Sequence, residues 1–158
     1  MTRHGEGVRQ TIDESLSQGA ITYRDGQVVR EPLGSGATVL TFGGGHRRML
    51  PGPVGDLEAA RRASGAPDVV AYIADPAAPI SETDSCAWAE VVASDGTSAV
   101  AELVMGEGLR ATAAIAAEAT GRVLAGAAPG AWTAGQLLGL ALVTRVTGAH
   151  VTVDGRPA

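Results

Sequence analysis

Lysine and asparagine are both absent from this chain of 158 residues, and all twelve of its basic residues are arginines. Enzymes that bind pyridoxal phosphate or form a Schiff base need a lysine amine, and a Walker-A loop needs a lysine as well. The composition therefore excludes these classes. Lysine and asparagine codons are AT-rich, whereas those of the abundant alanine, glycine and arginine are GC-rich, so the bias also indicates a high-GC bacterial genome.

Cysteine is scarce too, and long apolar runs are missing. The single cysteine, Cys86, cannot form an internal disulfide, which fits a reducing compartment. No window reaches the roughly 18 apolar residues that span a bilayer, and the first ten residues lack the apolar core of a signal peptide. We therefore expect a cytoplasmic protein that has no membrane partner.

The chain has neither a basic patch nor many aromatic residues. Its formal net charge is -5, its arginines are scattered, and aromatic residues make up 3% of the sequence. Proteins that bind nucleic acids use clustered basic residues, often with aromatic side chains on which bases stack. A nucleic-acid partner is therefore not expected.

The first half of the chain alternates helix and strand signals. Val8, Ile12 and Leu16 have helical spacing, and Gly19 is placed to end that helix. Asp25-Gly26 lies between alternating residues, which is typical of a β-hairpin. A strand over residues 37–42 then leads into a run of three glycines, and this run predicts a turn between strands rather than a phosphate loop.

The stretch from Leu50 to Pro76 predicts a loop, a short helix, a second loop and a strand. Asp56 is placed at the N-cap of the helix, and Gly65 ends it. Residues 68–74 form an apolar run that predicts one continuous strand. A Pro-rich stretch follows, within which we expect a linker at residues 79–85.

The second half predicts a hairpin that turns at Asp95-Gly96, a long Ala-rich helix over residues 109–126, a loop with Trp132, and a final helix. Residues 149–155 are predicted to close the chain as an edge strand. The sum is a single α+β domain over residues 1–158, with a mostly antiparallel sheet on which helices pack.

Glu90 is the first candidate for chemistry. A two-residue turn at Asp95-Gly96 would pair Glu90 with Ala101 and Trp88 with Leu103. Glu90 would then be the one carboxylate on an apolar sheet face, where desolvation suits a general acid or base. The alternative is an ordinary acid at a sheet edge or in an ion pair with an arginine.

Other candidates have equally simple structural explanations. Asp56 could serve only as a helix N-cap, and Tyr72 could be a packed residue rather than a hydrogen-bond donor in a pocket. Trp88 and Trp132 could line a pocket or fill the core. A metal site is not expected, because His4, His46 and His150 lack the spacing of metal ligands. The sequence also lacks the G-x-S-x-G motif of acyl-transfer enzymes.

Three stretches, taken in order, resemble the second domain of saccharopine-dehydrogenase-like NADP oxidoreductases, including the trans-acting enoyl reductase group. GVRQTIDESLSQGAITYRDGQVVREPLG resembles the helix and hairpin that open that domain. The stretch from Leu50 to Ala74 resembles the family's WGD…A…STG.PNV..Y.A run, and the residues in register are Gly55, Asp56, Ala60, Gly65, Pro67, Val69 and Tyr72. The stretch from Ala87 to Gly139 resembles the family's closing region.

The departures from the family are specific. The chain lacks the G-x-G-x-x-G motif of a Rossmann domain, Val54 replaces the family's tryptophan, and Thr133-Ala134 replaces its Thr-Pro. A short linker stands where the family has a longer apolar insert. The resemblance therefore implies the substrate and dimerisation domain without the nucleotide half. It implies a homodimer, and it implies neither a bound cofactor nor hydride transfer.

Two hypotheses for function follow. The first is a cofactor-independent biosynthetic enzyme of bacterial secondary metabolism, which binds an apolar, polyketide-like substrate for cyclisation, cycloaddition or isomerisation. Its catalytic residues would be Glu90, Tyr72 and Asp56, and its substrate-binding residues Trp88, Trp132 and His46. The second is a non-catalytic module for dimerisation or ligand binding, or a partner of a separate NADP-binding subunit.

Overall fold

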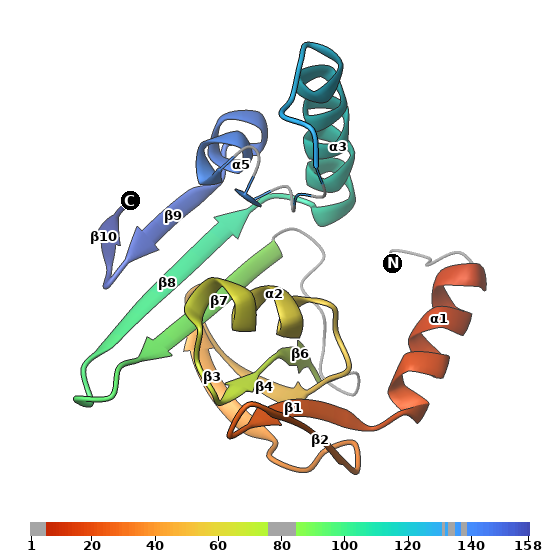
Figure 1. Ribbon diagram of the computed structural model, residues 1–158, viewed down its shortest axis with the longest axis vertical. Coiled ribbons are helices and arrows are strands. Elements are labelled where there is room, and N and C mark those ends of the chain that lie inside the picture. The colour runs from red at the N-terminus through yellow and green to blue at the C-terminus, as the bar shows by residue number, and fades with distance from the viewer. Residues whose placement is uncertain (1–5, 76–84, 131, 133–134, 137–138) are drawn as a thin grey trace. The chain divides into compact units, whose positions relative to one another are not determined.

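The computed structural model describes residues 6–75, 85–130, 132, 135–136 and 139–158. The chain divides into two compact units, residues 1–80 and 81–158, each with its own helices and antiparallel strands (Figure 1). The predicted α+β class is confirmed. Of the predicted linker at residues 79–85, only Ser85 lies within the described residues. That the two units form a single domain stays a prediction.

Unit 1 carries two small antiparallel sheets. One has the strand order β2-β1-β5 and the other the order β3-β4-β6. In chain order, the elements are α1 (Glu6–Ser17), β1 (Ala20–Arg24), β2 (Gln27–Glu31), β3 (Thr38–Phe42), β4 (Gly45–Pro51), α2 (Asp56–Ser64), β5 (Val69–Val70) and β6 (Tyr72–Ala74).

Both hairpins of unit 1 turn on two residues with positive φ. Asp25 and Gly26 have φ of 49° and 74°, and Gly43 and Gly44 have φ of 56° and 74°. Two consecutive left-handed residues make a turn whose twist matches that of the flanking strands. The hairpin predicted at Asp25-Gly26 is confirmed, and the glycine run forms the predicted turn between strands.

Strand β4 differs from the prediction of a loop that begins at Leu50. Leu50 and Pro51 still belong to the strand, where they pair with Ile73 and Tyr72 of β6. Proline is tolerated here because it lies at the strand end, where a missing N–H interrupts little of the ladder. The pairing with β6 is a long-range contact, so the local sequence could not show it.

The apolar run over residues 68–74 also departs from prediction, because it is two short strands instead of one. β5 pairs with Thr22 and Tyr23 of β1, whereas β6 pairs with β4 of the other sheet. Ala71 lies between them, and its carbonyl accepts a hydrogen bond from the Gly52 N–H at 3.0 Å. The break lets one segment contribute a strand to each sheet of unit 1.

Glycine ends the first two helical segments as predicted. The Gly19 N–H donates to the Leu16 carbonyl at 3.1 Å, and the Gly65 N–H donates to the Arg61 carbonyl at 2.9 Å. Both glycines are left-handed, with φ of 77° and 68°. This conformation ends a helix and satisfies a carbonyl that would otherwise lack a partner. The buried core of unit 1 gathers residues from three strands and α2: Ala20, Thr22, Phe42, Met49, Leu50 and Leu57.

Unit 2 contains one four-stranded antiparallel sheet with the order β10-β9-β8-β7. β9 is flanked on both sides, so the prediction that it is an edge strand was wrong, and the short β10 takes that place. In chain order, the elements are β7 (Ser85–Val92), β8 (Ser98–Met105), α3 (Gly108–Leu124), α5 (Leu140–Thr147), β9 (His150–Val153) and β10 (Arg156–Pro157).

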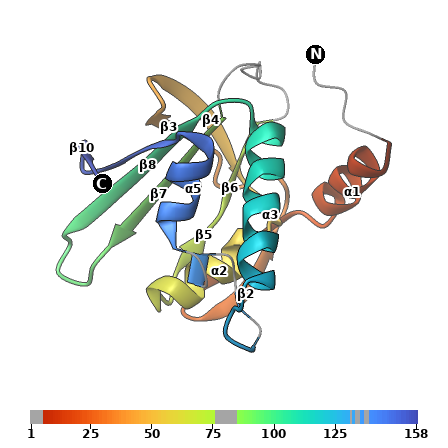
Figure 2. The ribbon, with the colours of Figure 1, turned by 90° about the horizontal axis from the view of Figure 1, so that it is seen from above.

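The helices α3 and α5 of unit 2 pack against each other (Figures 1 and 2). Glu107 caps α3, since its carboxylate accepts hydrogen bonds from the Leu109 and Arg110 N–H groups at 3.1 and 2.9 Å. α5 begins after Gly139, whose φ of 69° is not helical. Ala111 and Leu142 are the buried residues of the two helices. No helix in the described part of the chain is long and apolar enough to cross a membrane.

Candidate functional site

The predicted site residues are divided between the two units. Asp56, Tyr72 and His46 lie in unit 1, and Glu90, Trp88 and Trp132 lie in unit 2. Glu90 and Trp88 share strand β7, and the other four come from different parts of the chain.

Asp56 is the first residue of α2 rather than its N-cap. Gly55 holds the cap position without a side-chain hydrogen bond, and Asp56 is exposed. The N-cap predicted for Asp56 is therefore one residue too late. A carboxylate in the first helical turn still interacts favourably with the positive end of the helix dipole, so the residue has a structural reason to be acidic.

Tyr72 and His46 lie on neighbouring strands of the second sheet of unit 1. Tyr72 is half-buried on β6 opposite Pro51, while His46 is exposed near the start of β4. The His46 ring Nδ1 lies 2.9 Å from the hydroxyl oxygen of Thr41, its cross-strand partner. The imidazole is thus held by its own hairpin.

The hairpin of β7 and β8 has a register different from the predicted one. Glu90 pairs with Val100 and Trp88 pairs with Glu102, one residue away from the predicted partners. The reason is the loop, which has three residues and carries its left-handed residue at Gly96, with φ of 85°. The Ala93 N–H donates to the Thr97 carbonyl at 2.8 Å and so closes the longer loop.

Asp95 holds this loop in place. Its carboxylate accepts hydrogen bonds from the Thr97 hydroxyl at 2.7 Å and from the Thr97 N–H at 2.9 Å. The hydroxyl contact, and then the backbone contact, lower the pKa of the Asp95 carboxyl. The S-D-G-T sequence was a usable signal, because Asp bonded to a residue two positions later is typical of a turn with its own side-chain support.

The one-residue shift moves every β8 side chain to the opposite face of the sheet. The face that carries Trp88 and Glu90 therefore holds Val100 and Glu102, and not Ala101 and Leu103. Glu90 itself is exposed, so the desolvated carboxylate expected from the sequence is not found there. Glu102 is half-buried opposite Trp88. The sequence did not indicate Glu102 as a candidate because the predicted register placed it on the other face of the sheet.

Trp132 is 52% exposed and is held by its own loop. Its indole N–H donates to the Ala128 carbonyl at 3.2 Å. The ring lies so close to Gly130 that a Cβ there would come within 2.8 Å of the indole nitrogen. A glycine is therefore needed beneath the ring.

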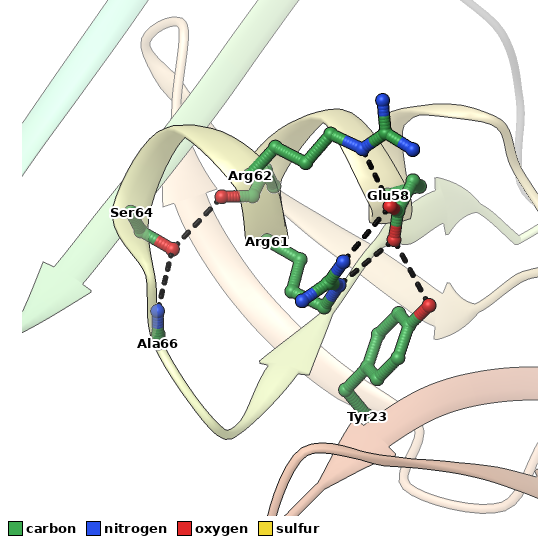
Figure 3. A network of polar contacts seen from close by, with 7 residues as sticks. Tyr23, Glu58, Arg61, Arg62, Ser64 and Ala66 are labelled. Atoms are coloured by element: carbon green, nitrogen blue, oxygen red, sulfur yellow. Dashed lines mark hydrogen bonds and ion pairs between the residues drawn. The ribbon is translucent and has the colours of Figure 1, made fainter.

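The most connected polar cluster was not predicted (Figure 3). The Glu58 carboxylate accepts two hydrogen bonds from Arg61, at 2.8 and 3.0 Å, and one from Arg62 at 2.6 Å. The Tyr23 hydroxyl of β1 donates to it at 2.9 Å, and the Arg61 guanidinium lies over the Tyr23 ring. The signal in the sequence was Glu58 followed by arginines three and four residues later.

This cluster has the electrostatics of a structural clamp. Hydrogen bonds from Arg61, then from Arg62 and Tyr23, lower the pKa of the Glu58 carboxyl far below its ordinary value of 4.5. Contact with Glu58 in turn raises the pKa of the Arg61 guanidinium. A carboxylate and a guanidinium that both stay charged around neutral pH do not exchange protons readily, so the cluster is poorly suited to acid–base chemistry. Its role is structural, because the hydrogen bond from Tyr23 to Glu58 ties α2 to β1.

Among the described residues, no three His, Cys, Asp or Glu side chains come together as a metal ion requires. Comparisons of the chain with protein-family models, with curated proteins and with solved structures find no match. The resemblance to saccharopine-dehydrogenase-like proteins therefore stays a prediction.

Proposed function

We propose that this chain is a non-catalytic association module, which joins another protein chain through the four-stranded sheet of unit 2. The observation that carries the proposal is that β7 lies at an edge of this sheet and exposes apolar side chains. This strand of eight residues is the edge of the sheet, and its Val91 and Val92 are 54% and 62% exposed. Natural proteins shield edges of this kind, because open backbone groups flanked by apolar side chains pair with other chains.

The titratable groups support a structural rather than a catalytic reading. Shifted pKa values gather at active sites when burial and charge are arranged for proton transfer. Among the described residues, the shifted groups are Glu58 and Arg61 in the clamp, Asp95 in a turn and Glu107 at a helix cap. Each of these shifts is explained by a contact that holds the fold together.

The resemblance noted in the sequence supports the same proposal from another side, since it implies a substrate and dimerisation domain that lacks the nucleotide half. The partner is then a second copy of this chain or a separate NADP-binding subunit. Either would bury the exposed valines at the end of β7.

Sedimentation velocity and light scattering on the purified chain test this function. We expect a species of twice the 15.9 kDa mass of one chain, whose population rises with concentration. A folded chain that stays monomeric up to about 100 μM, and that binds no NADP-binding subunit encoded beside it, would contradict the proposal.

A second candidate is the cofactor-independent biosynthetic enzyme, and one observation favours it. Trp88, Glu90 and Glu102 share a face of the sheet, with Glu102 half-buried opposite the indole. A carboxylate beside an aromatic wall could handle a proton during cyclisation, cycloaddition or isomerisation of an apolar substrate.

This second candidate is tested with a chain that has a single tryptophan. The chain contains two tryptophans, so Trp132→Phe leaves Trp88 as the only one. Energy transfer from Trp88 to the neutral apolar dye Nile red should saturate if this face binds apolar molecules, and Glu102→Gln should change the apparent affinity. A linear, non-saturating signal would remove the apolar site from consideration.

A further inference from the structure

The two edges of the unit 2 sheet differ in how well they are protected. β10 is two residues long and consists of Arg156 and Pro157. A short edge with a charge and a proline does not template further pairing. β7, in contrast, has eight residues, contains no proline, and has Glu90 as its one charged side chain. Its pairing with β8 runs without a bulge from Ser85 to Val92, and among the strands that the structure describes β7 pairs with β8 alone, so β7 is the unprotected edge of this sheet.

Backbone geometry shows which groups of β7 face that edge. The N–H of Ala93 donates to the Thr97 carbonyl, so the odd-numbered residues of this strand direct their backbone groups toward β8. The hydrogen bonds of β8 follow the same alternation. Val100, which pairs with Glu90, directs its carbonyl away from β7 and accepts a hydrogen bond from the Asp154 N–H on the β9 side. The backbone groups of Trp88, Glu90 and Val92 therefore point away from β8, where no strand of the described chain pairs with them.

The side-chain pattern of β7 is complementary to itself about Ala89. In an antiparallel pair of identical strands, the outward-facing groups meet only when the two-fold axis passes through a residue. An axis at Glu90 would place two carboxylates opposite each other, which is unfavourable. An axis at Ala89 sets Glu90 opposite Trp88, Val91 opposite Ala87, and one small alanine against the other.

We infer that two copies of this chain pair antiparallel through β7, with the two-fold axis at Ala89, so that their four-stranded sheets become one continuous sheet. The inference rests on the proposed association function and names its partner. Pairs between Trp88 of one copy and Glu90 of the other carry the central backbone hydrogen bonds. An axis at Trp88 would instead set the outward-facing backbone groups of Val92 opposite a residue outside the strand, whereas an axis at Ala89 keeps them within it.

Charged substitutions at Ala89 test the proposed register of the two β7 strands. Ala89→Arg and Ala89→Glu each place like charges at the axis, and each should weaken dimerisation by about 100-fold or more. An equimolar mixture of the two variants should form a heterodimer again, because opposite charges then meet. Ala99→Arg is the matched control, since Ala99 is exposed on the same sheet face but lies on β8, away from the open edge.

A cross-link tests the same contact directly. Ala89 would form a non-hydrogen-bonded pair with its copy, in which the Cα atoms lie about 4.5 Å apart and a disulfide fits. Oxidised Ala89→Cys should therefore run as a covalent dimer, while Val91→Cys, which lies opposite Ala87, should not. The native Cys86 serves as the background in each sample.

Glu90→Pro provides a variant that changes the backbone of the edge as well as the side chain. It removes an outward-facing N–H and leaves the β8 ladder intact, so the folded chain should become monomeric. Far-ultraviolet circular dichroism checks that this variant folds. If it does not fold, the Ala89→Arg and Ala89→Glu variants provide the test instead. A wild-type chain that is monomeric would overturn this inference, and it would overturn the proposed function as well if it also binds no NADP-binding subunit. A dimer that survives Ala89→Arg and gives no Ala89→Cys cross-link would overturn the inference alone.

Discussion

Glu58 joins a helix and a strand of unit 1, because Tyr23 donates to it from β1 while Arg61 and Arg62 donate from α2. Three donors on one carboxylate stabilise its charged form, so its folded pKa lies well below the value in the unfolded chain. A carboxyl of this kind adds stability above its unfolded pKa and loses that contribution as pH falls toward the folded pKa.

Glu58→Gln should therefore lower the urea midpoint at pH 7, and the difference from wild type should shrink as pH drops below about 4.5. The shift will be modest, since both Glu58 and Arg61 are more than a third exposed. Urea unfolding of both proteins across this pH range is the measurement.

Glu118→Gln is the matched control, because Glu118 forms a helical ion pair with Arg122 at 2.9 Å and its pair is also partly exposed. It should produce a smaller difference at pH 7. An equal effect from both substitutions would show that the three-donor arrangement at Glu58 has no special weight.

Two glycines with similar conformations separate backbone strain from steric overlap. Gly19 and Gly65 both end a helical segment with positive φ. A Cβ at Gly19 would overlap the Glu31 carbonyl oxygen, whereas a Cβ at Gly65 meets no atom within 4 Å. Gly65→Ala should lower the free energy of unfolding by about 1 kcal/mol, the strain of a left-handed alanine.

Gly19→Ala should lower the free energy of unfolding further, by about 3 kcal/mol, because β1 must move away from β2 to admit the methyl group. Urea denaturation followed by circular dichroism measures both variants. Equal losses would mean that the backbone at Gly19 relaxes freely and that the close approach to Glu31 is not a constraint.

At the scale of elements, the loop between β7 and β8 decides which side chains share a sheet face. Its three-residue form depends on Gly96, which has φ of 85°. The α3 helix of the same unit contains Gly121, which has open space around the position of a Cβ. Alanine should therefore destabilise unit 2 at position 96 and stabilise it at position 121.

Gly96→Ala should lower the free energy of unfolding by about 1 to 2 kcal/mol through strain in the loop. Gly121→Ala should raise it by roughly 0.5 to 1 kcal/mol, because alanine favours the helix over the unfolded chain. Chemical denaturation gives both values. A stabilising Gly96→Ala would mean that the loop adopts a form without a left-handed residue.

The elements also show where sequence reasoning succeeds and where it stops. Gly65 ends α2 and Asp25-Gly26 turns a hairpin because glycine and short polar residues act on their own backbone. The candidate site is harder to predict, since Glu102 comes to face Trp88 only when the loop has three residues. One residue of difference in a loop reverses a whole strand face.

At the scale of the whole molecule, the net negative charge opposes association of two copies, whereas pairing through β7 favours it. Each copy carries a formal net charge of -5, so two copies repel one another over several ångströms at low ionic strength. The inferred contact itself consists of backbone hydrogen bonds and mostly apolar side chains, and its one charged residue, Glu90, lies opposite Trp88 and not opposite another charge, so salt hardly screens it.

Dimerisation should therefore strengthen by a few-fold as salt rises from about 10 mM to about 300 mM, where the Debye length falls below about 10 Å. Sedimentation equilibrium at these salt concentrations is the measurement. Weaker association in high salt would instead indicate that the contact depends on ion pairs, contrary to a pairing through β7.

The sequence by itself determined the α+β class, the glycines that end α1 and α2, and the hairpin turn at Asp25-Gly26. These features depend on residue type and on neighbours a few positions away. Only the tertiary structure decided the register of β7 and β8, the pairing of β4 with β6, and the break at Ala71. Strand pairing is a long-range choice among registers with similar local propensities, and the differences among them appear only when the partner strand is in place.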